Sequence, residues 1–146
     1  DQDKFDLTKI DELKAYSTVS YINTGVPHLV LEVDDIDTID VQGIGKRLRQ
    51  HPLFSPEGTN VNFIKIEQKK QLSMRTYERG VEAETYACGT GTTAAAIHYS
   101  RFYNEEGDIL FQAKGGDLKV TLSKDLKKVF FSGTVMATFE GSFLFF

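Results

Sequence analysis

One alanine-rich segment constrains the fold more than any other part of the chain. Residues 89–100 contain no Asp, Glu, Lys or Arg, and the first charged side chain that follows is Arg101. A helix without a charged face is buried rather than laid on a surface. Its small side chains let neighbouring elements approach closely, and the polar residues 104–107 are typical of a helix end. The sequence therefore predicts a buried central helix over residues 89–102.

Most of the remaining chain consists of short segments with strand-like composition. These segments are residues 18–22, 29–33, 61–67, 72–77, 109–113, 118–122, 129–131 and 134–139, separated by turn-forming residues. The segments 61–67 and 72–77 are close enough in sequence to form a hairpin. A short surface helix is predicted over residues 41–48, where apolar residues fall at helical spacing. The predicted fold class is α+β, with short strands curled as a mixed, barrel-like sheet around a central buried helix.

The length and charge of the chain limit the partners it can have. With 146 residues it suits one domain, and we assign residues 17–146 to that folded lobe and residues 1–16 to a linker or boundary segment. The net charge of -4 argues against nucleic acid and anionic membrane as main partners. No stretch is apolar for long enough to cross a bilayer, and residues 1–14 do not resemble a secretory signal. Small molecules and proteins remain as candidate partners.

The chain contains a single cysteine, Cys88, directly before the predicted central helix. A lone cysteine excludes an internal disulfide and a multi-cysteine zinc site, which agrees with a cytoplasmic protein in a reducing compartment. The motif Cys88-Gly89-Thr90-Gly91 places the sulfur beside the N–H groups of the first helical turn. Such a helix start favours bound anions and the thiolate form of a cysteine. Cys88 is therefore a candidate catalytic thiol.

Three other interpretations of this motif are open. Residues 89–94 match the glycine fingerprint of dinucleotide-binding folds, but the preceding residues are polar and Asp108 precedes the next strand instead of ending it. In a cysteine hydrolase only His28 is a suitable base, because His98 lies more than two helical turns from Cys88. In the third interpretation Cys88 is only a small structural residue.

Four motifs resemble those of the diaminopimelate epimerase family, in order and in spacing. They are Thr24-Gly25-Val26-Pro27-His28, the Asn-containing segment 54–63, Tyr77-Glu78-Arg79-Gly80, and Glu84-Thr85-Tyr86-Ala87-Cys88-Gly89-Thr90-Gly91. The resemblance covers roughly residues 21–141. It implies the C-terminal lobe of a two-lobed fold. The partner it implies is an N-terminal lobe of similar fold, bearing a second cysteine that this chain lacks.

The resemblance implies a cofactor-independent isomerase that inverts the α-carbon of an amino acid, interconverting LL- and meso-diaminopimelate. Inversion needs a base on one face of the α-carbon and an acid on the other, and two facing thiols meet this need. Neither a cofactor nor a metal is expected. Because this chain supplies one sulfur, we expect it to be inactive without the missing N-terminal lobe.

The resemblance also assigns roles to particular residues. The catalytic group consists of Cys88, His28 and Glu78, and the substrate-binding group consists of Asn60, Glu78, Arg79, Gly89 and Thr90. The backbone N–H groups of Gly89 and Thr90 receive the α-carboxylate, and Arg79 holds a distal carboxylate bidentately. The competing interpretation of Arg79 is a surface ion pair with Glu82 or Glu84.

Departures from the family pattern leave the substrate open. Val26 stands where the family often has Asn before the proline, and Ala83 replaces a common glycine. Within segment 54–63, Asn60 is the stronger candidate for a substrate contact and Asn62 the weaker. A proline racemase-like isomerase is the nearest alternative, because its motif also reads Cys-Gly-Thr-Gly-Thr, but Arg79 favours a substrate with a distal carboxylate. A non-catalytic binding module derived from such a lobe is the alternative outside enzymes.

Overall fold

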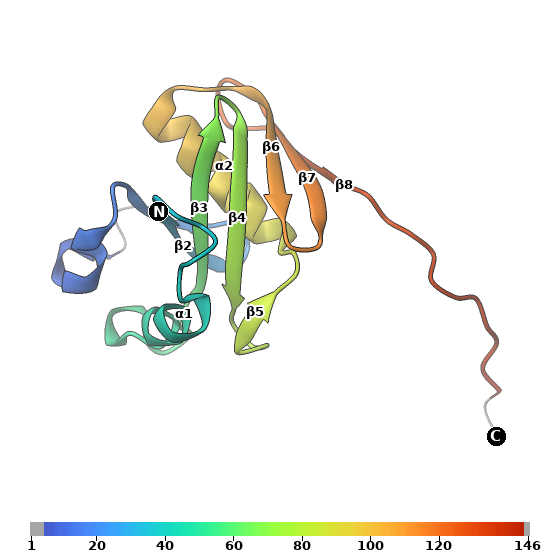
Figure 1. Ribbon diagram of the computed structural model, residues 1–146, viewed down its shortest axis with the longest axis horizontal. Coiled ribbons are helices and arrows are strands. Elements are labelled where there is room, and N and C mark those ends of the chain that lie inside the picture. Colours follow the sequence, from blue (N-terminus) through green and yellow to red (C-terminus); the bar gives the residue numbers. More distant parts are fainter. Residues whose placement is uncertain (1–4, 145–146) are drawn as a thin grey trace.

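A computed structural model describes residues 5–144, which form one mixed β-sheet with an α-helix against each face (Figure 1). The helices are α1 (Val41–Arg49) and α2 (Gly89–Tyr103), with short 3-10 turns at Leu7–Lys9, Asp11–Ala15 and Pro52–Phe54. The strands are β1 (Val19–Asn23), β2 (Pro27–Glu32), β3 (Asn60–Gln68), β4 (Gln71–Glu78), β5 (Ala83–Thr85), β6 (Gly107–Ala113), β7 (Gly116–Leu122) and β8 (Val129–Gly133).

The strand order along the sheet is β1-β2-β3-β4-β6-β7-β8, and β5 pairs with β4 off this path. The pairs β2/β3 and β4/β6 are parallel, and the other pairs formed by the described residues are antiparallel. Each parallel pair is joined by a crossover that contains a helix, α1 between β2 and β3 and α2 between β4 and β6. The predicted mixed sheet and the predicted β3–β4 hairpin are therefore confirmed.

Residue alternation along the strands decides which side chains meet which helix. In β3, Val61 and Phe63 belong to the hydrophobic core that includes Leu48 of α1, whereas Ile64 belongs to the core that includes Ala95 of α2. Helix α2 contacts β1 and β2 at one end of the sheet and β7 and β8 at the other. The sheet is thus curled around α2, which confirms the predicted α+β architecture.

Helix α2 is the buried central helix that the sequence predicts. Ala94, Ala95 and Ala96 are 0% exposed, because their small side chains let the strands pack directly against the helix. The helix begins after Cys88, which has extended backbone, and ends at Asn104, whose φ of 53° gives the left-handed cap typical of a helix C-terminus. The predicted surface helix is also present as α1, capped by the side chain of Asp40.

The chain after β8 contradicts the strand predicted over residues 134–139. Residues 134–144 contain no strand, and the extended chain leads away from the sheet (Figure 1). Strand-like composition produces a strand only where a neighbouring strand offers hydrogen-bond partners, and β8 is the last strand at this edge. Val135, Met136 and Phe139 are consequently 93%, 82% and 85% exposed.

The N-terminal segment packs onto the fold. Ile10 and Leu13 are 3% and 5% exposed and belong to the same core as Phe63, although residues 1–16 are expected to be a linker. Residues 1–4 lie outside the described part of the chain, so the boundary at residue 16 stays a prediction. Within residues 5–144, no helix has the length and apolar character needed to cross a membrane.

Candidate active site

Polar side chains gather at one end of the sheet, on the face that α2 covers. The parallel register sets His28 beside Asn60, and the antiparallel register sets Asn62 beside Thr76. All four residues are buried, with at most 4% of their surface exposed. Along each strand these residues lie an even number of positions from the side chains that pack against α2, so they share the face that α2 covers. Helix α2 starts at this end of the sheet, and its N-cap is Cys88.

Asn62 is the centre of this polar group. Its Nδ2 donates to the carbonyl oxygen of Leu29 at 3.3 Å and lies 3.1 Å from Nδ1 of His28. Its Oδ1 accepts a hydrogen bond of 3.1 Å from the hydroxyl of Thr76. These bonds determine the orientation of the amide, since each of its ends meets a complementary group. The pairing also offsets the cost of burying an amide.

His28 is held as a neutral imidazole. Burial, followed by the charge of Arg79, lowers the pKa of His28 to about 4. Because Nδ2 of Asn62 donates to Nδ1, the ring proton is assigned to Nε2. Nε2 is buried and has no hydrogen-bond partner within residues 5–144. At neutral pH His28 therefore provides a free donor in the polar group, and its other nitrogen is occupied by Asn62.

Gly91 brings the start of α2 against this polar group. A Cβ at residue 91 would overlap Oδ1 of Asn62 and would lie 3.2 Å from Sγ of Cys88. The close approach therefore requires glycine. Cys88 is partly exposed, and its Sγ lies 3.5 Å from the hydroxyl oxygen of Thr90. The thiol is thus accessible and lies near the buried amide, rather than being enclosed by hydrocarbon side chains.

The first turn of α2 presents backbone N–H groups to its surroundings. Among the described residues no side chain caps this start, since Cys88 forms no capping hydrogen bond. The first N–H groups of an α-helix have no partner inside the helix, so those of Gly89 and Thr90 are suited to bind an anion. Two groups border the turn: the hydroxyl of Thr24 donates to the carbonyl of Thr90 at 3.2 Å, and the ring of Phe131 lies 3.4 Å from where a Cβ of Gly89 would be.

Asn60 holds the turn that carries Arg79. Its Nδ2 donates to the carbonyl oxygen of Pro27 at 2.8 Å, and its Oδ1 accepts from the backbone N–H of Arg79 at 2.8 Å. Both ends of this amide therefore tie β2 and β3 to the segment that follows β4. The guanidinium of Arg79 donates to the carbonyl oxygen of Glu57 at 3.2 Å.

The carboxylates considered as ion-pair partners of Arg79 have other partners. Glu82 pairs with Arg49 at 2.9 Å, and Glu84 pairs with Arg75 at 2.7 Å. Within residues 5–144 Arg79 forms no ion pair. The interpretation of Arg79 as a surface ion pair with Glu82 or Glu84 is therefore wrong, and within the described residues its charge has no ion-pair partner.

Glu78 is the last residue of β4 and is half-buried beside Arg79. Among the described residues its carboxylate forms no hydrogen bond or ion pair. Two unpaired charges of opposite sign thus lie next to each other in the chain, at the same end of the sheet as Cys88. Such a pair is suited to a ligand that carries both an ammonium and a carboxylate group.

Sequence reasoning underestimated Asn62 and missed Thr76 and Phe131. Side chains two residues apart in a strand share a face, so Asn62 lies on the same face as Asn60, and this alternation was the available signal. Thr76 and Phe131 reach the site through strand pairing and sheet curvature, for which the local sequence carries no signal.

The fold is similar to that of two solved structures. One is a phenazine biosynthesis protein of the PhzF family from Enterococcus faecalis, with a TM-score of 0.51 and 18% identity, covering 67% of this chain and 34% of that one. The other, of the same family from Bacillus anthracis, has a TM-score of 0.50 and 19% identity, covering 75% of this chain and 34% of that one. These likenesses concern the α+β fold alone.

The sequence comparisons are more specific. Residues 20–138 match the family model described as diaminopimelate epimerase. A diaminopimelate epimerase from Aquifex aeolicus (strain VF5) is 45% identical over 123 residues, which are 83% of this chain and 44% of the relative. One from Flavobacterium psychrophilum is 33% identical over 138 residues, or 92% of this chain and 54% of the relative. This chain belongs to the diaminopimelate epimerase family, and it spans about half the length of these curated relatives.

Proposed function

We propose that this chain is a catalytic lobe of a diaminopimelate epimerase, an isomerase that interconverts LL- and meso-diaminopimelate in the cytoplasmic synthesis of lysine and cell-wall precursors. The observation that carries the proposal is the environment of Cys88. Its thiol is partly exposed at the uncapped start of α2, close to the buried amide of Asn62. Family membership supports the reaction class, because the curated relatives are named for this activity.

In the proposed reaction Cys88 exchanges a proton with the substrate α-carbon on one face. A second lobe supplies the sulfur on the opposite face, because one group cannot take a proton from one side and return it to the other. The N–H groups of Gly89 and Thr90 receive the α-carboxylate, whose negative charge grows as the proton leaves. Removing one such preorganised donor typically costs about 2.7–4 kcal/mol of transition-state stabilisation. The scheme uses no cofactor.

Glu78 and Arg79 bind the polar groups of the substrate. The guanidinium of Arg79 holds the distal carboxylate bidentately, and the carboxylate of Glu78 binds an ammonium group. Asn60 positions the backbone of Arg79 and completes this end of the site. The absence of an ion pair for Arg79 and of any side-chain partner for Glu78, within residues 5–144, supports these roles.

His28 acts in this scheme as a neutral hydrogen-bond donor. Its lowered pKa keeps the ring uncharged, and the bond between Asn62 and Nδ1 keeps the proton on Nε2. A neutral donor steadies a polar group of the substrate, or the thiol, without removing the proton that Cys88 must exchange.

The missing partner in the proposal is an N-terminal lobe that bears the second cysteine. The segment after β8 supports a contact with such a lobe, because apolar side chains on it are exposed, among them Val135, Met136 and Phe139. Exposed apolar surface of this kind usually marks a protein contact. We therefore expect this apolar surface to be buried against the second lobe.

Mixing this chain with a separately produced N-terminal lobe of a relative tests the proposal. We expect the mixture to convert LL-diaminopimelate to the meso form and to exchange the α-proton with deuterated solvent, both measured by NMR. Replacing the thiol in Cys88→Ala removes the acid–base group, which lowers turnover by about 100- to 10,000-fold. Circular dichroism checks that the variant is folded. A folded, associated mixture without turnover would favour a non-catalytic binding module instead.

Arg79→Ala tests the distal subsite. Loss of a bidentate, charge-assisted contact is expected to raise KM for diaminopimelate roughly 10- to 100-fold. Turnover of a monocarboxylic amino acid such as lysine, which lacks the distal carboxylate, should change far less. Arg101→Ala is the matched control, since it removes the same charge near the other end of α2. Equal losses for both substrates would take Arg79 out of the distal site and favour a proline racemase-like substrate range.

A further inference from the structure

The turn between β6 and β7 touches the segment that delivers Cys88. The backbone N–H of Gly115, in this turn, donates to the carbonyl oxygen of Tyr86 at 2.7 Å. Tyr86 lies between the end of β5 and the start of α2, only two residues before the thiol. Its side chain is 71% exposed, so burial does little to hold this segment in place. The hydrogen bond to Gly115 is therefore a main restraint on the path of the chain into Cys88.

The close contact with Tyr86 leaves little room for a side chain at residue 115. A Cβ at residue 115 would lie 3.0 Å from the carbonyl oxygen of Tyr86 and 3.1 Å from its Cβ, both tighter than ordinary van der Waals contact. The backbone of Gly115 is not in the left-handed region, so an alanine there meets a steric contact but no conformational strain. The neighbouring Gly116 shows the opposite: its φ is +128°, and no atom lies within 4 Å of a Cβ built there.

Lys114 adds a second attachment between the same turn and the same segment. Its Nζ lies 3.4 Å from Oε2 of Glu84 and 5.9 Å from the centre of the Tyr86 ring. A cation over an aromatic face and beside a carboxylate is attracted to both. Glu84 is itself fixed, because the guanidinium of Arg75 donates to its two carboxylate oxygens at 2.7 and 2.9 Å.

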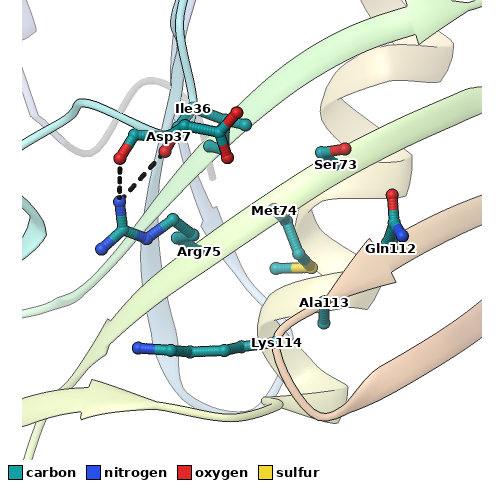
Figure 2. A pocket seen from close by; sticks show the side chains of 8 residues that line it. All are labelled: Ile36, Asp37, Ser73, Met74, Arg75, Gln112, Ala113 and Lys114. Carbon is teal, nitrogen blue, oxygen red and sulfur yellow. Dashed lines mark hydrogen bonds between the residues drawn. The ribbon is translucent and has the colours of Figure 1, made fainter.

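Arg75 extends this attachment to the rest of the fold. Its Nη1 donates to the carbonyl oxygens of Ile36, Asp37 and Ile39 at 3.0, 3.2 and 3.2 Å. Figure 2 shows Arg75 directed toward this loop, and Arg75 and Lys114 both line a cavity of about 430 Å³. The donors of Arg75 are thus used within the protein, and the hydrogen bond from its guanidinium holds Glu84 ionised by lowering the pKa of that carboxyl.

We infer that Gly115 and Lys114 are positioning residues for Cys88, holding the Glu84–Tyr86 segment so that the thiol stays at the start of α2. Their catalytic importance rests on the proposed function, but the mechanical link belongs to this chain alone. The reaction rate depends strongly on where the reacting groups lie, since a displacement of about 1 Å can lower the rate on the order of 100-fold. The turn thus acts on the reaction through Cys88 without touching the substrate.

In the isolated chain, the position of Cys88 at the helix start can be followed by how much faster its thiol reacts with an anionic reagent than with a neutral one. Cys88 is the only thiol, so its alkylation can be followed without interference. The measured quantity is the ratio of the rate constants for iodoacetate, an anion, and iodoacetamide, its neutral counterpart. A thiol at a helix start attracts the anion, and unfolding or simple exposure affects both reagents alike. We expect Gly115→Ala to lower this ratio at least threefold and Gly141→Ala, the matched control, to leave it within 1.5-fold, because a Cβ at residue 141 meets no atom within 4 Å and no backbone strain.

A second pair of variants keeps the inference testable if Gly115→Ala does not fold. Lys114→Gln removes the attachment to Glu84 and Tyr86, and Lys119→Gln removes an equal charge from β7, where Lys119 pairs with Asp108. The assay runs at 0.15 M ionic strength, where charges are screened beyond about 8 Å, and Lys119→Gln controls for the loss of one positive charge. Lys114→Gln should lower the ratio at least twofold, Lys119→Gln should not, and Lys114→Arg should restore it.

Epimerisation in the mixture with an N-terminal lobe gives the catalytic readout. Gly115→Ala is expected to lower kcat about tenfold with little change in KM, since Arg79 and the helix amides still bind the substrate. Equal alkylation ratios within each matched pair would overturn the inference. A lowered ratio in a mixture that shows no epimerisation would support the mechanical link and would contradict the proposed function instead.

Discussion

The two faces of strand β3 are equally buried but differ in what they bury. Val61 and Phe63 are 0% exposed on the side of α1, where they lie in a core of hydrocarbon and aromatic side chains. Asn60 and Asn62 are 4% and 0% exposed on the side of α2, where hydrogen bonds occupy their amides. Burial alone therefore does not separate core from site. The separation comes from whether the buried atoms need partners.

Strand β2 shows the same contrast between an apolar face toward α1 and a polar face toward α2. Leu29 belongs to the α1 core, while His28, next to it, points to the α2 side with one ring nitrogen unpaired within residues 5–144. The apolar face contributes stability through the hydrophobic effect. The polar face can hold buried polar side chains near Cys88, because the apolar face keeps the strands in place. Changing one face at a time therefore tests whether the two faces are independent.

Phe63→Ala is expected to have the largest effect on stability. Removing a fully buried ring leaves a cavity in the α1 core and should cost about 3–5 kcal/mol in the free energy of unfolding. Urea denaturation measures this loss. Under native conditions the alkylation ratio of Cys88 should stay unchanged, because the altered side chain faces away from α2. A changed ratio in the folded variant would mean that the two faces are not independent.

Acidification should weaken the polar face. Burial lowers the pKa of His28 and of His98 to about 4 in the folded chain, below the usual 6.5, so the unfolded chain binds protons more readily. Stability is then complete above pH 6.5 and is lost as the pH falls from 6.5 toward 4. At pH 5 the loss is roughly 2 kcal/mol for each histidine. Urea titrations at pH 7.5 and 5.0 measure it, and His28→Gln and His98→Gln should each flatten the dependence.

Asn62→Ala is expected to have a smaller effect on stability than Phe63→Ala. It leaves the buried hydroxyl of Thr76 and the carbonyl of Leu29 without their partner, which costs about 1–3 kcal/mol. Thr121→Ala is the control, since it removes a hydrogen bond to Asp108 at the surface and should cost less than about 1 kcal/mol. If both variants lose the same stability in urea, the polar group is not a cooperative part of the fold.

Much of the fold could be predicted because its signals are local. The uncharged run 89–100 predicts a buried helix from its composition, and α2 occupies residues 89–103. Hairpins and turns also follow from nearby residues, as in β3 and β4. The strand expected at residues 134–139 is wrong because strand formation depends on a neighbour, and the sheet ends at β8. The three-residue β5 carried too little pattern to be predicted.

The candidate site was predictable in part for the same reason. Cys88, Gly89 and Thr90 form one continuous motif, so their place at a helix start follows from the sequence. The free charge of Arg79 depends on Glu82 and Glu84 pairing elsewhere, which no local pattern reveals.

The sequence by itself determined the family resemblance, the buried central helix and the thiol at its start, because these depend on residue types at short, regular spacing. Only the tertiary structure decided that Asn62 joins His28 to Thr76, and that Gly115 holds Tyr86. Those contacts link segments far apart in the chain. Their geometry follows from sheet register and curvature, which arise when the whole core packs together.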